Sequence, residues 1–174
     1  AIKDGKTGTQ IKFDDVVQRL KPARVVVVGE QHDQRSHHEL QRRLVQVLAG
    51  DGPGLVVGLE MLAWDKQPEL DRFNRGDLDV DGLRQAVDWK KAWGFDFSLY
   101  APIFAAGHDG GARFVALNAP RELVRAIRQK GVEGLSDDEK SKLPDLDLGD
   151  PLHRAWFERI FSSAGHPLKG VEFD

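Results

Sequence analysis

Three short apolar runs punctuate the chain, and a polar side chain follows each of them. The runs lie within the predicted strands 24–28, 55–59 and 113–117, of which the first and the last begin with an arginine. A strand that is buried on both faces of a sheet needs an uninterrupted apolar run of this kind. The polar residues that follow are Glu30, Glu60 and Asn118. The pattern therefore predicts three buried strands, each ending at a polar group.

Elsewhere, apolar residues recur at intervals of three and four, which is typical of helices. The helices predicted from this spacing are residues 11–20, 36–48, 68–75, 81–93, 99–107, 120–127 and 152–163. Ser136 and Glu139 match a capping box at the start of a further short helix. A strand, a helix and a strand within about 35 residues form a right-handed unit with parallel strands.

The predicted fold is a single α/β domain over residues 1–174, with a central, mainly parallel β-sheet flanked by helices. One part of it, an aromatic-rich helical segment, carries Trp64, Phe73, Trp89, Trp93, Phe95 and Phe97. Three strands are few for a complete sheet of this class, so either others are hidden or the chain is part of something longer.

Charge and composition narrow the range of partners. The net charge is −3, and basic and acidic residues are interspersed, which argues against a nucleic-acid partner. No apolar run approaches the roughly 20 residues that span a bilayer. The chain has no cysteine, which excludes disulfides and thiolate ligands. A targeting segment or a lipidated cysteine ahead of Ala1 stays compatible with the sequence, so any membrane attachment would require a lipid anchor that this chain lacks.

Glu30, His32, Glu60 and Asn118 converge at one edge of the sheet if the three strands are parallel neighbours. Such a polar crevice can bind a divalent metal or carry out acid/base chemistry, with His32 or a carboxylate activating water. The alternative is structural, because polar groups at strand ends commonly cap helices and close loops. Three coincident strand ends favour a site.

Two adjacent histidines, His37 and His38, follow the first of these motifs. Neighbouring residues on a helix point about 100° apart, so at most one of the two faces the crevice. The spacing fits no closed zinc pattern. For the second histidine, a capping or solvent-exposed role is the better interpretation.

Tyr100 is the only tyrosine in the chain. Its phenol suits either ferric iron, including haem iron, or an ordinary buried hydrogen bond, and the ordinary role is favoured on the residue alone. Arg121 lies in the first turn of the helix after Asn118, where its guanidinium can bind a carboxylate or a propionate, or pair with Glu60.

Several ordered motifs together resemble the ChaN-like haem-binding uptake family, which belongs to a superfamily with the Tiki proteases and the erythromycin esterases. The resemblance covers about residues 11–128. It is carried by VVVVGEQHD at 25–33, His37 and His38, GLEM at 58–61, Gln67, Trp93, YAP at 100–102 and NAPR at 118–121.

The resemblance implies an α/β fold and a haem-binding role in bacterial iron or haem uptake, with haem bound at a homodimer interface. It makes Tyr100 the candidate ligand of the haem iron and places Arg121, His37 and His38 near the propionates. It also implies a periplasmic protein or an outer-membrane lipoprotein with its anchor removed, which serves an outer-membrane haem receptor or uptake system.

Two further expectations follow from the resemblance. Family members usually continue into another helix and strand, so the C-terminal part of the family domain is expected to be missing from this chain. The strand-end set is shared with hydrolytic relatives, so the alternative function is a metal-assisted or acid/base hydrolase using Glu30, His32 and Glu60.

Overall fold

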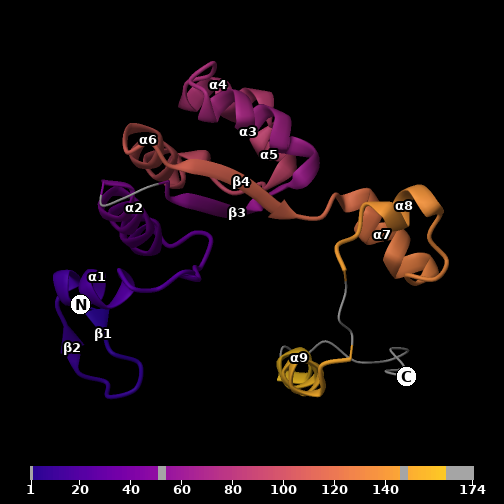
Figure 1. The fold of residues 1–174 in the computed structure, drawn as a ribbon, viewed down its shortest axis with the longest axis horizontal. Coiled ribbons are helices and arrows are strands. Elements are labelled where there is room, and N and C mark those ends of the chain that lie inside the picture. The colour runs from indigo at the N-terminus through magenta and orange to yellow at the C-terminus, as the bar shows by residue number, and fades with distance from the viewer. Residues whose placement is uncertain (1, 51–53, 146–148, 164–174) are drawn as a thin grey trace. The chain divides into compact units, whose positions relative to one another are not determined.

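The computed structural model describes residues 2–50, 54–145 and 149–163 (Figure 1). The chain divides into two compact units, residues 1–124 and 125–174. The candidate site lies wholly in the first unit. The expectation of a single domain over residues 1–174 stays a prediction.

The chain begins with a hairpin that the sequence pattern did not predict. Strands β1 (Ile2–Lys3) and β2 (Gln10–Ile11) pair antiparallel, and helix α1 (Phe13–Leu20) follows them. The guanidinium of Arg43, on helix α2 (Arg35–Gly50), lies 3.9 Å from the centre of the Phe13 ring. This cation–π contact joins the hairpin and α1 to the rest of the first unit.

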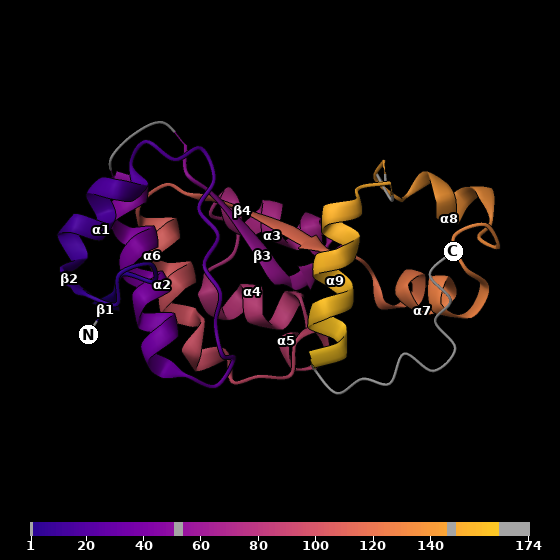
Figure 2. The same cartoon turned by 90° about the horizontal axis from the view of Figure 1, so that it is seen from below.

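The central sheet consists of the two parallel strands β3 (Val56–Ala63) and β4 (Arg113–Asn118). Val57 is paired with Phe114, and Leu59 with Ala116. Both strands contain the predicted apolar runs, but β3 continues through Glu60 to Ala63, so the prediction that this strand ends at Glu60 is wrong. The parallel pairing confirms the α/β fold class. Helices α2 and α3 (Gln67–Asn74) lie on opposite sides of this pair (Figures 1 and 2).

A helical stretch connects the two strands. It begins with a 3-10 turn, η1 (Trp64–Lys66), ahead of α3. After α3 come α4 (Val80–Ala86), α5 (Trp89–Ala92), a second 3-10 turn η2 (Phe97–Leu99) and α6 (Ala101–Asp109). The single helix predicted over residues 81–93 is wrong. Asp88 interrupts it with a left-handed backbone, φ 50°, so that Trp89 turns into the core and is buried.

The core lies between these helices and the sheet. Its largest fully buried side chains are Tyr100, Phe73, Phe104, Phe114, Leu62, Leu70, Leu83 and Val87. Ring pairs such as Phe104 and Phe114, with centres 5.1 Å apart, bind α6 to β4. Much of the predicted aromatic-rich segment therefore forms the core.

Side-chain amides close the edge of β4 that faces away from β3. The Phe114 N–H donates to Asn74 Oδ1 at 2.8 Å, and Asn74 Nδ2 donates to the Phe114 carbonyl at 2.9 Å. The Ala116 N–H donates to Gln67 Oε1 at 2.8 Å. Because these amides take the place of a neighbouring strand, β4 is a protected edge.

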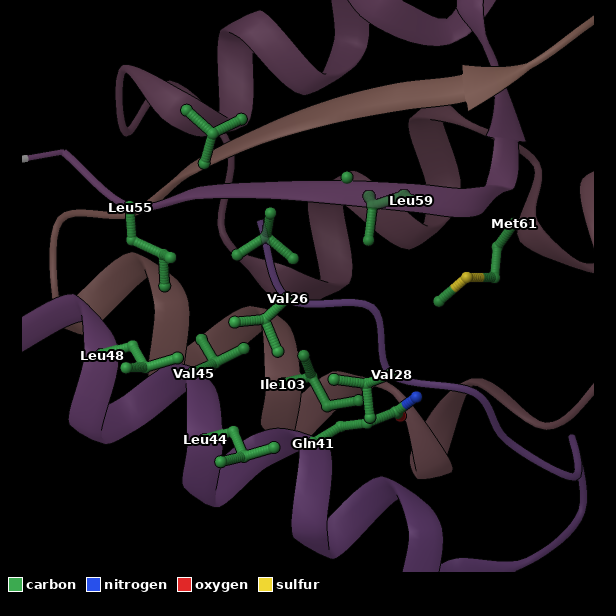
Figure 3. Close-up of a pocket in the computed structure, with 13 residues that line it drawn as sticks. Val26, Val28, Gln41, Leu44, Val45, Leu48, Leu55, Leu59, Met61 and Ile103 are labelled. Carbon is green, nitrogen blue, oxygen red and sulfur yellow. The ribbon is translucent and has the colours of Figure 1, made fainter. Parts of the chain in front are cut away.

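The strand predicted over residues 24–28 is wrong for this structure, where those residues form an irregular extended segment. Figure 3 shows Val26 and Val28 pointing into an apolar groove between α2 and β3. Val25 and Val27 are instead 78% and 90% exposed. The side chains of Val26 and Val28 thus attach the segment to the groove, but its backbone lacks the pairing that defines a strand.

The second unit is helical in the part that the structure describes. It holds most of α7 (Arg121–Lys130), then α8 (Asp137–Ser141) and α9 (Pro151–Ser163). The predicted capping box at Ser136 and Glu139 is confirmed. Within residues 2–50, 54–145 and 149–163, none of the helices combines the length and the apolar character of a membrane span.

Candidate functional site

A buried carboxylate, Glu30, accepts hydrogen bonds from three parts of the chain. Its Oε1 accepts from the Tyr100 hydroxyl at 2.6 Å and lies 2.9 Å from His32 Nδ1. Its Oε2 accepts from Gln41 Nε2 at 2.9 Å and lies 3.3 Å from His38 Nδ1. The Glu30 side chain is 9% exposed, so these contacts replace most of its water.

These partners come from elements that lie far apart in sequence. Glu30 and His32 belong to the irregular segment before α2, His38 and Gln41 project from the first turns of α2, and Tyr100 precedes α6. The rings of His38 and Tyr100 pack with their centres 4.4 Å apart. The carboxylate thus ties the irregular segment to two helices that pack against each other.

The hydrogen bonds decide the charge state of Glu30. Burial by itself raises the pKa of this carboxyl, but the bonds from Tyr100, His32 and Gln41 outweigh it and bring the pKa below its ordinary value. Glu30 is therefore an anion at neutral pH, and an anion at this position only accepts hydrogen bonds.

Tyr100 is completely buried, and both roles of its hydroxyl are in use. It donates to Glu30 and accepts from Trp93 Nε1 at 2.9 Å. Burial, followed by the bond to Glu30, raises the pKa of this phenol well above its ordinary value. The role of Tyr100 as ligand of haem iron stays a prediction, and it would require the phenol to leave this pocket.

His38 is part of the frame of the site. Its side chain is buried, with Nε2 at 3.1 Å from the His32 carbonyl and Nδ1 at 3.2 Å from Gln41 Oε1. His37 holds the loop as well, because its Nδ1 accepts from the Gln31 N–H at 2.9 Å. Their predicted contact with propionates stays a prediction.

His32 differs from these two histidines because its side chain is 37% exposed. The Trp93 ring lies edge-on to it at 4.7 Å between centres, and the Phe95 ring lies at 4.8 Å. Phe95 is itself exposed. The imidazole therefore sits at the surface, between two aromatic rings and above a buried carboxylate.

The remaining strand-end residues do not join the contacts of Glu30. Asn118 is exposed and caps its own loop, donating to the Glu60 carbonyl at 3.2 Å and accepting from the Ala119 N–H at 2.9 Å. The Glu60 side chain is exposed and acts on Tyr100 only through its charge. Only part of the predicted crevice is therefore formed. Glu30 and His32 are in contact, whereas Asn118 bonds to backbone groups, which is the structural role considered as its alternative.

Arg121 lies close in space to the segment that carries Trp93 and Phe95. Its NH2 group donates to the Ala92 carbonyl at 3.0 Å, next to Trp93 in sequence, and the residue is exposed. A guanidinium carries five N–H donors, so most of its capacity is available for an anion. This placement is compatible with the predicted carboxylate-binding role.

Two contributors, Gln41 and Trp93, were not among the site residues predicted from sequence, although Trp93 belongs to the motifs of the family resemblance. Gln41 binds Glu30, and Trp93 fixes the Tyr100 hydroxyl. A usable signal for Gln41 was present, because it follows His38 by three residues and so lies on the same face of the helix. In the part of the chain that the structure describes, no group of three or more His, Cys, Asp or Glu side chains is arranged to hold a metal ion.

The fold and the site define an α/β protein in which a buried glutamate presents a surface histidine among aromatic rings. The family model described as "Haem-binding uptake, Tiki superfamily, ChaN" matches residues 16–173. The chain belongs to this family.

Two individual proteins are similar to the chain. A solved structure titled "Cofacial heme binding to ChaN of Campylobacter jejuni" has a TM-score of 0.66 and 23% sequence identity, covering 95% of this chain and 64% of that one. The protein RETICULATA-RELATED 5, chloroplastic, of Arabidopsis thaliana is 26% identical over 133 residues, which are 72% of this chain and 18% of that protein. The chain thus spans less than two thirds of either relative, and the structural match concerns the fold.

Proposed function

We propose that the chain is a haem-binding protein of bacterial iron or haem uptake. Membership of the ChaN family supports the proposal. The observation that carries it is the exposed His32, flanked by Trp93 and Phe95 and backed by Glu30. A porphyrin supplies the equatorial ligands of its iron, so one axial side chain and an apolar surface are enough to hold it.

Two features of this surface fit the parts of a haem. The exposed Phe95 and the half-buried Trp93 offer apolar ring surface to the macrocycle, whose burial contributes about 25 cal/mol per Å² before the costs of association. Arg121 offers free N–H donors to a propionate. The groove of Figure 3 is a different feature, since its volume of about 180 Å³ is below the roughly 300 Å³ of common ligand pockets.

The same proposal includes the oligomeric state, the location and the partner of the protein. A haem bound at the surface keeps one face exposed, and a second copy of the chain would cover it, so haem is proposed to bind at a homodimer interface. The protein would act in the periplasm, attached to the outer membrane by a lipid anchor outside this chain, and would exchange haem with an outer-membrane receptor or uptake system.

Titration with ferric haem tests the proposal. Addition to the apo protein is expected to give a saturable shift of the Soret band, and sedimentation velocity is expected to show a dimer with haem and a monomer without it. Phe95→Ala should weaken binding because it removes an exposed ring beside His32. Leu117→Ala, which trims an exposed side chain on β4, is the matched control and should bind normally. A wild-type protein that gives no saturable shift would contradict the proposal.

A hydrolase remains the second candidate because Glu30 and His32 are in contact at 2.9 Å. In that case the pair would activate water, with or without a metal. Metal analysis of the purified protein and ester or peptide turnover in Glu30→Gln test this candidate. Turnover at the wild-type rate in this variant rules out the pair as its catalyst.

A further inference from the structure

We propose that a cavity beside α4 and α5 binds a small zwitterionic molecule, which carries an ammonium and a carboxylate on an apolar body, as a dipeptide does. The cavity lies between the end of α4, the start of α5 and residues 94–97. Its volume is about 510 Å³, within the range of about 300–1,000 Å³ that is common for ligand sites. Of the residues that line it, only Phe95 also packs against His32. Such a site would operate whether or not the chain binds haem.

Two residues with a left-handed backbone shape the walls of this cavity. Asp88, with φ 50°, is the only non-glycine residue with a positive φ among the described residues, and it turns the chain from α4 into α5. Gly94, with φ 93°, follows α5 and begins the loop on the other side. Glycine would fit the backbone of Asp88 at a lower cost, and side chains held in this conformation are concentrated at functional sites. The carboxylate of Asp88 therefore calls for an explanation beyond the turn itself.

The inner wall of the cavity is aromatic and is fixed before any ligand binds. Trp89 Nε1 donates to the Phe95 carbonyl at 2.8 Å, which ties the loop to α5. The rings of Trp89 and Phe97 pack edge to face, with their centres 5.0 Å apart. Trp89 is buried, whereas Phe95 is exposed and Phe97 is half-buried. Phe95 and Phe97 thus offer apolar surface to a ligand, and a preformed wall lowers the entropy cost of binding.

Side chains of both charges line the same cavity without neutralising each other. The Asp88 carboxylate, the Lys90 ammonium and the Gln85 amide have no hydrogen bond or ion pair with another described residue. Asp88 and Lys90 are two positions apart, a spacing at which side chains at a helix do not face each other. One anion and one cation therefore remain available to a ligand.

The other two charged side chains of the cavity are already engaged. Arg84 Nε lies 3.3 Å from Asp81 Oδ1, one turn earlier on α4. Asp96 accepts from the Ser98 N–H at 2.9 Å, and this bond is the main reason why the pKa of Asp96 is below its ordinary value. Arg84 and Asp96 thus hold the helix and the loop, whereas Asp88 and Lys90 are left to select the ligand.

The available groups define the chemistry of the ligand. A carboxylate accepts hydrogen bonds from an ammonium, and an ammonium donates to a carboxylate. A ligand with only one charge would leave either Asp88 or Lys90 without a partner. The rings of Phe95 and Phe97 suit an apolar side chain. A dipeptide such as phenylalanyl-phenylalanine has all three parts.

Phenylalanyl-phenylalanine titrated into the wild-type protein tests the site, with nuclear magnetic resonance and isothermal titration calorimetry as readouts. Saturable shifts are expected for the Trp89 indole N–H and for the backbone amides of residues 94–97. The N-acetylated dipeptide lacks the ammonium and the dipeptide amide lacks the carboxylate, so each should bind at least about tenfold more weakly. The proposal is overturned if the free dipeptide gives no saturable shift, or if either capped form binds as tightly as the free one.

Substitutions of the two ionic residues assign their roles. Asp88→Asn keeps a residue that tolerates the left-handed backbone, and in this variant the free dipeptide should lose its advantage over the N-acetylated form. In Lys90→Gln it should lose its advantage over the dipeptide amide. Lys91→Gln is the matched control, because Lys91 is exposed and does not line the cavity, and it should bind as the wild type does.

A second variant at Asp88 separates binding from folding. Asp88→Gly suits the left-handed backbone, so it should be at least as stable as the wild type, and it should bind the free dipeptide at least about tenfold more weakly. Wild-type affinity in Asp88→Gly or in Lys90→Gln would overturn the assignment of the site.

Discussion

Residues 25–28 and strand β3 are both largely apolar and are each associated with a glutamate, Glu30 and Glu60, yet the surroundings of the two segments are opposite. Strand β3 pairs with β4 and buries Leu59 and Leu62, whereas Glu60, between these two residues, is exposed. Residues 25–28 pair with no strand among the described residues and expose Val27, whereas Glu30 just beyond them is buried among four polar partners.

The contrast shows that a regular backbone and a fixed side chain have separate causes. Pairing with β4 and burial against the helices hold β3 in place. The bonds that Glu30 receives from α2 and from the start of α6 hold the loop around it. A functional group can thus be immobilised by its own hydrogen bonds at the end of an irregular segment. The account predicts large effects in the core of β3 and around Glu30, and small effects at the exposed positions of residues 25–28.

The largest effect is expected from Leu59→Ala in β3. Leu59 is 3% exposed, so its truncation leaves a cavity in the core. The free energy of unfolding should fall by about 2–5 kcal/mol, measured by urea denaturation. A loss below about 1 kcal/mol would mean that the β3 core is packed less tightly than the structure shows.

Glu30→Gln is expected to have the next largest effect. The amide replaces one of the two acceptor oxygens by a donor, so either Gln41 or the pair Tyr100 and His32 loses its acceptor, and the free energy of unfolding should fall by about 1–3 kcal/mol. Glu60→Gln is the matched control and should change it by less than about 0.5 kcal/mol, because Glu60 is exposed. Equal losses of unfolding free energy in the two variants would contradict the claim that Glu30 is held by its hydrogen bonds whereas Glu60 is not.

The ionisation of Tyr100 gives a pH-dependent prediction. Because this is the only tyrosine, ultraviolet difference spectroscopy reports on it alone. The phenol has a raised pKa in the folded protein, so its contribution to stability is complete below the ordinary pKa of about 10. That contribution is lost as the pH rises further, at about 1.4 kcal/mol per pH unit. Tyrosinate should therefore form only as the protein unfolds; formation near pH 10 in folded protein would contradict the buried position.

The smallest effect is expected at Val27. This side chain is 90% exposed, so Val27→Thr should change the free energy of unfolding by less than about 0.5 kcal/mol. If residues 24–28 were a strand buried on both faces, as the apolar run suggests, the same substitution would place a hydroxyl in the core. A loss above about 1 kcal/mol would therefore support the strand.

The sequence predicted the parts of the fold that depend on local pattern. The positions of β3, β4, α2, α3 and α9 follow from apolar periodicity, and Ser136 and Glu139 form the expected capping box. Residues 24–28 have the same pattern as β3, but pairing depends on a neighbouring backbone, which the pattern does not report. The break at Asp88 depends on the fit of Trp89 into the core, which local spacing does not report either.

The site was predictable in its residue types but not in its connections. Glu30, His32, His38 and Tyr100 were all candidates from sequence, and the structure brings them together. That Glu30 binds Tyr100, 70 positions further along the chain, is a tertiary contact that no spacing rule indicates. The convergence of Glu60 and Asn118 with Glu30 required three parallel strands, whereas β3 and β4 form the only parallel pair among the described residues.

A double-mutant cycle on Glu30 and Tyr100 tests the central claim most directly. The claim is that a hydrogen-bonded carboxylate, not strand pairing, fixes the segment that carries His32. Glu30→Gln, Tyr100→Phe and the double variant would each be unfolded in urea at neutral pH. The account predicts a coupling energy of about 1–3 kcal/mol between the two residues. Additive effects, with a coupling energy below about 0.5 kcal/mol, would contradict it.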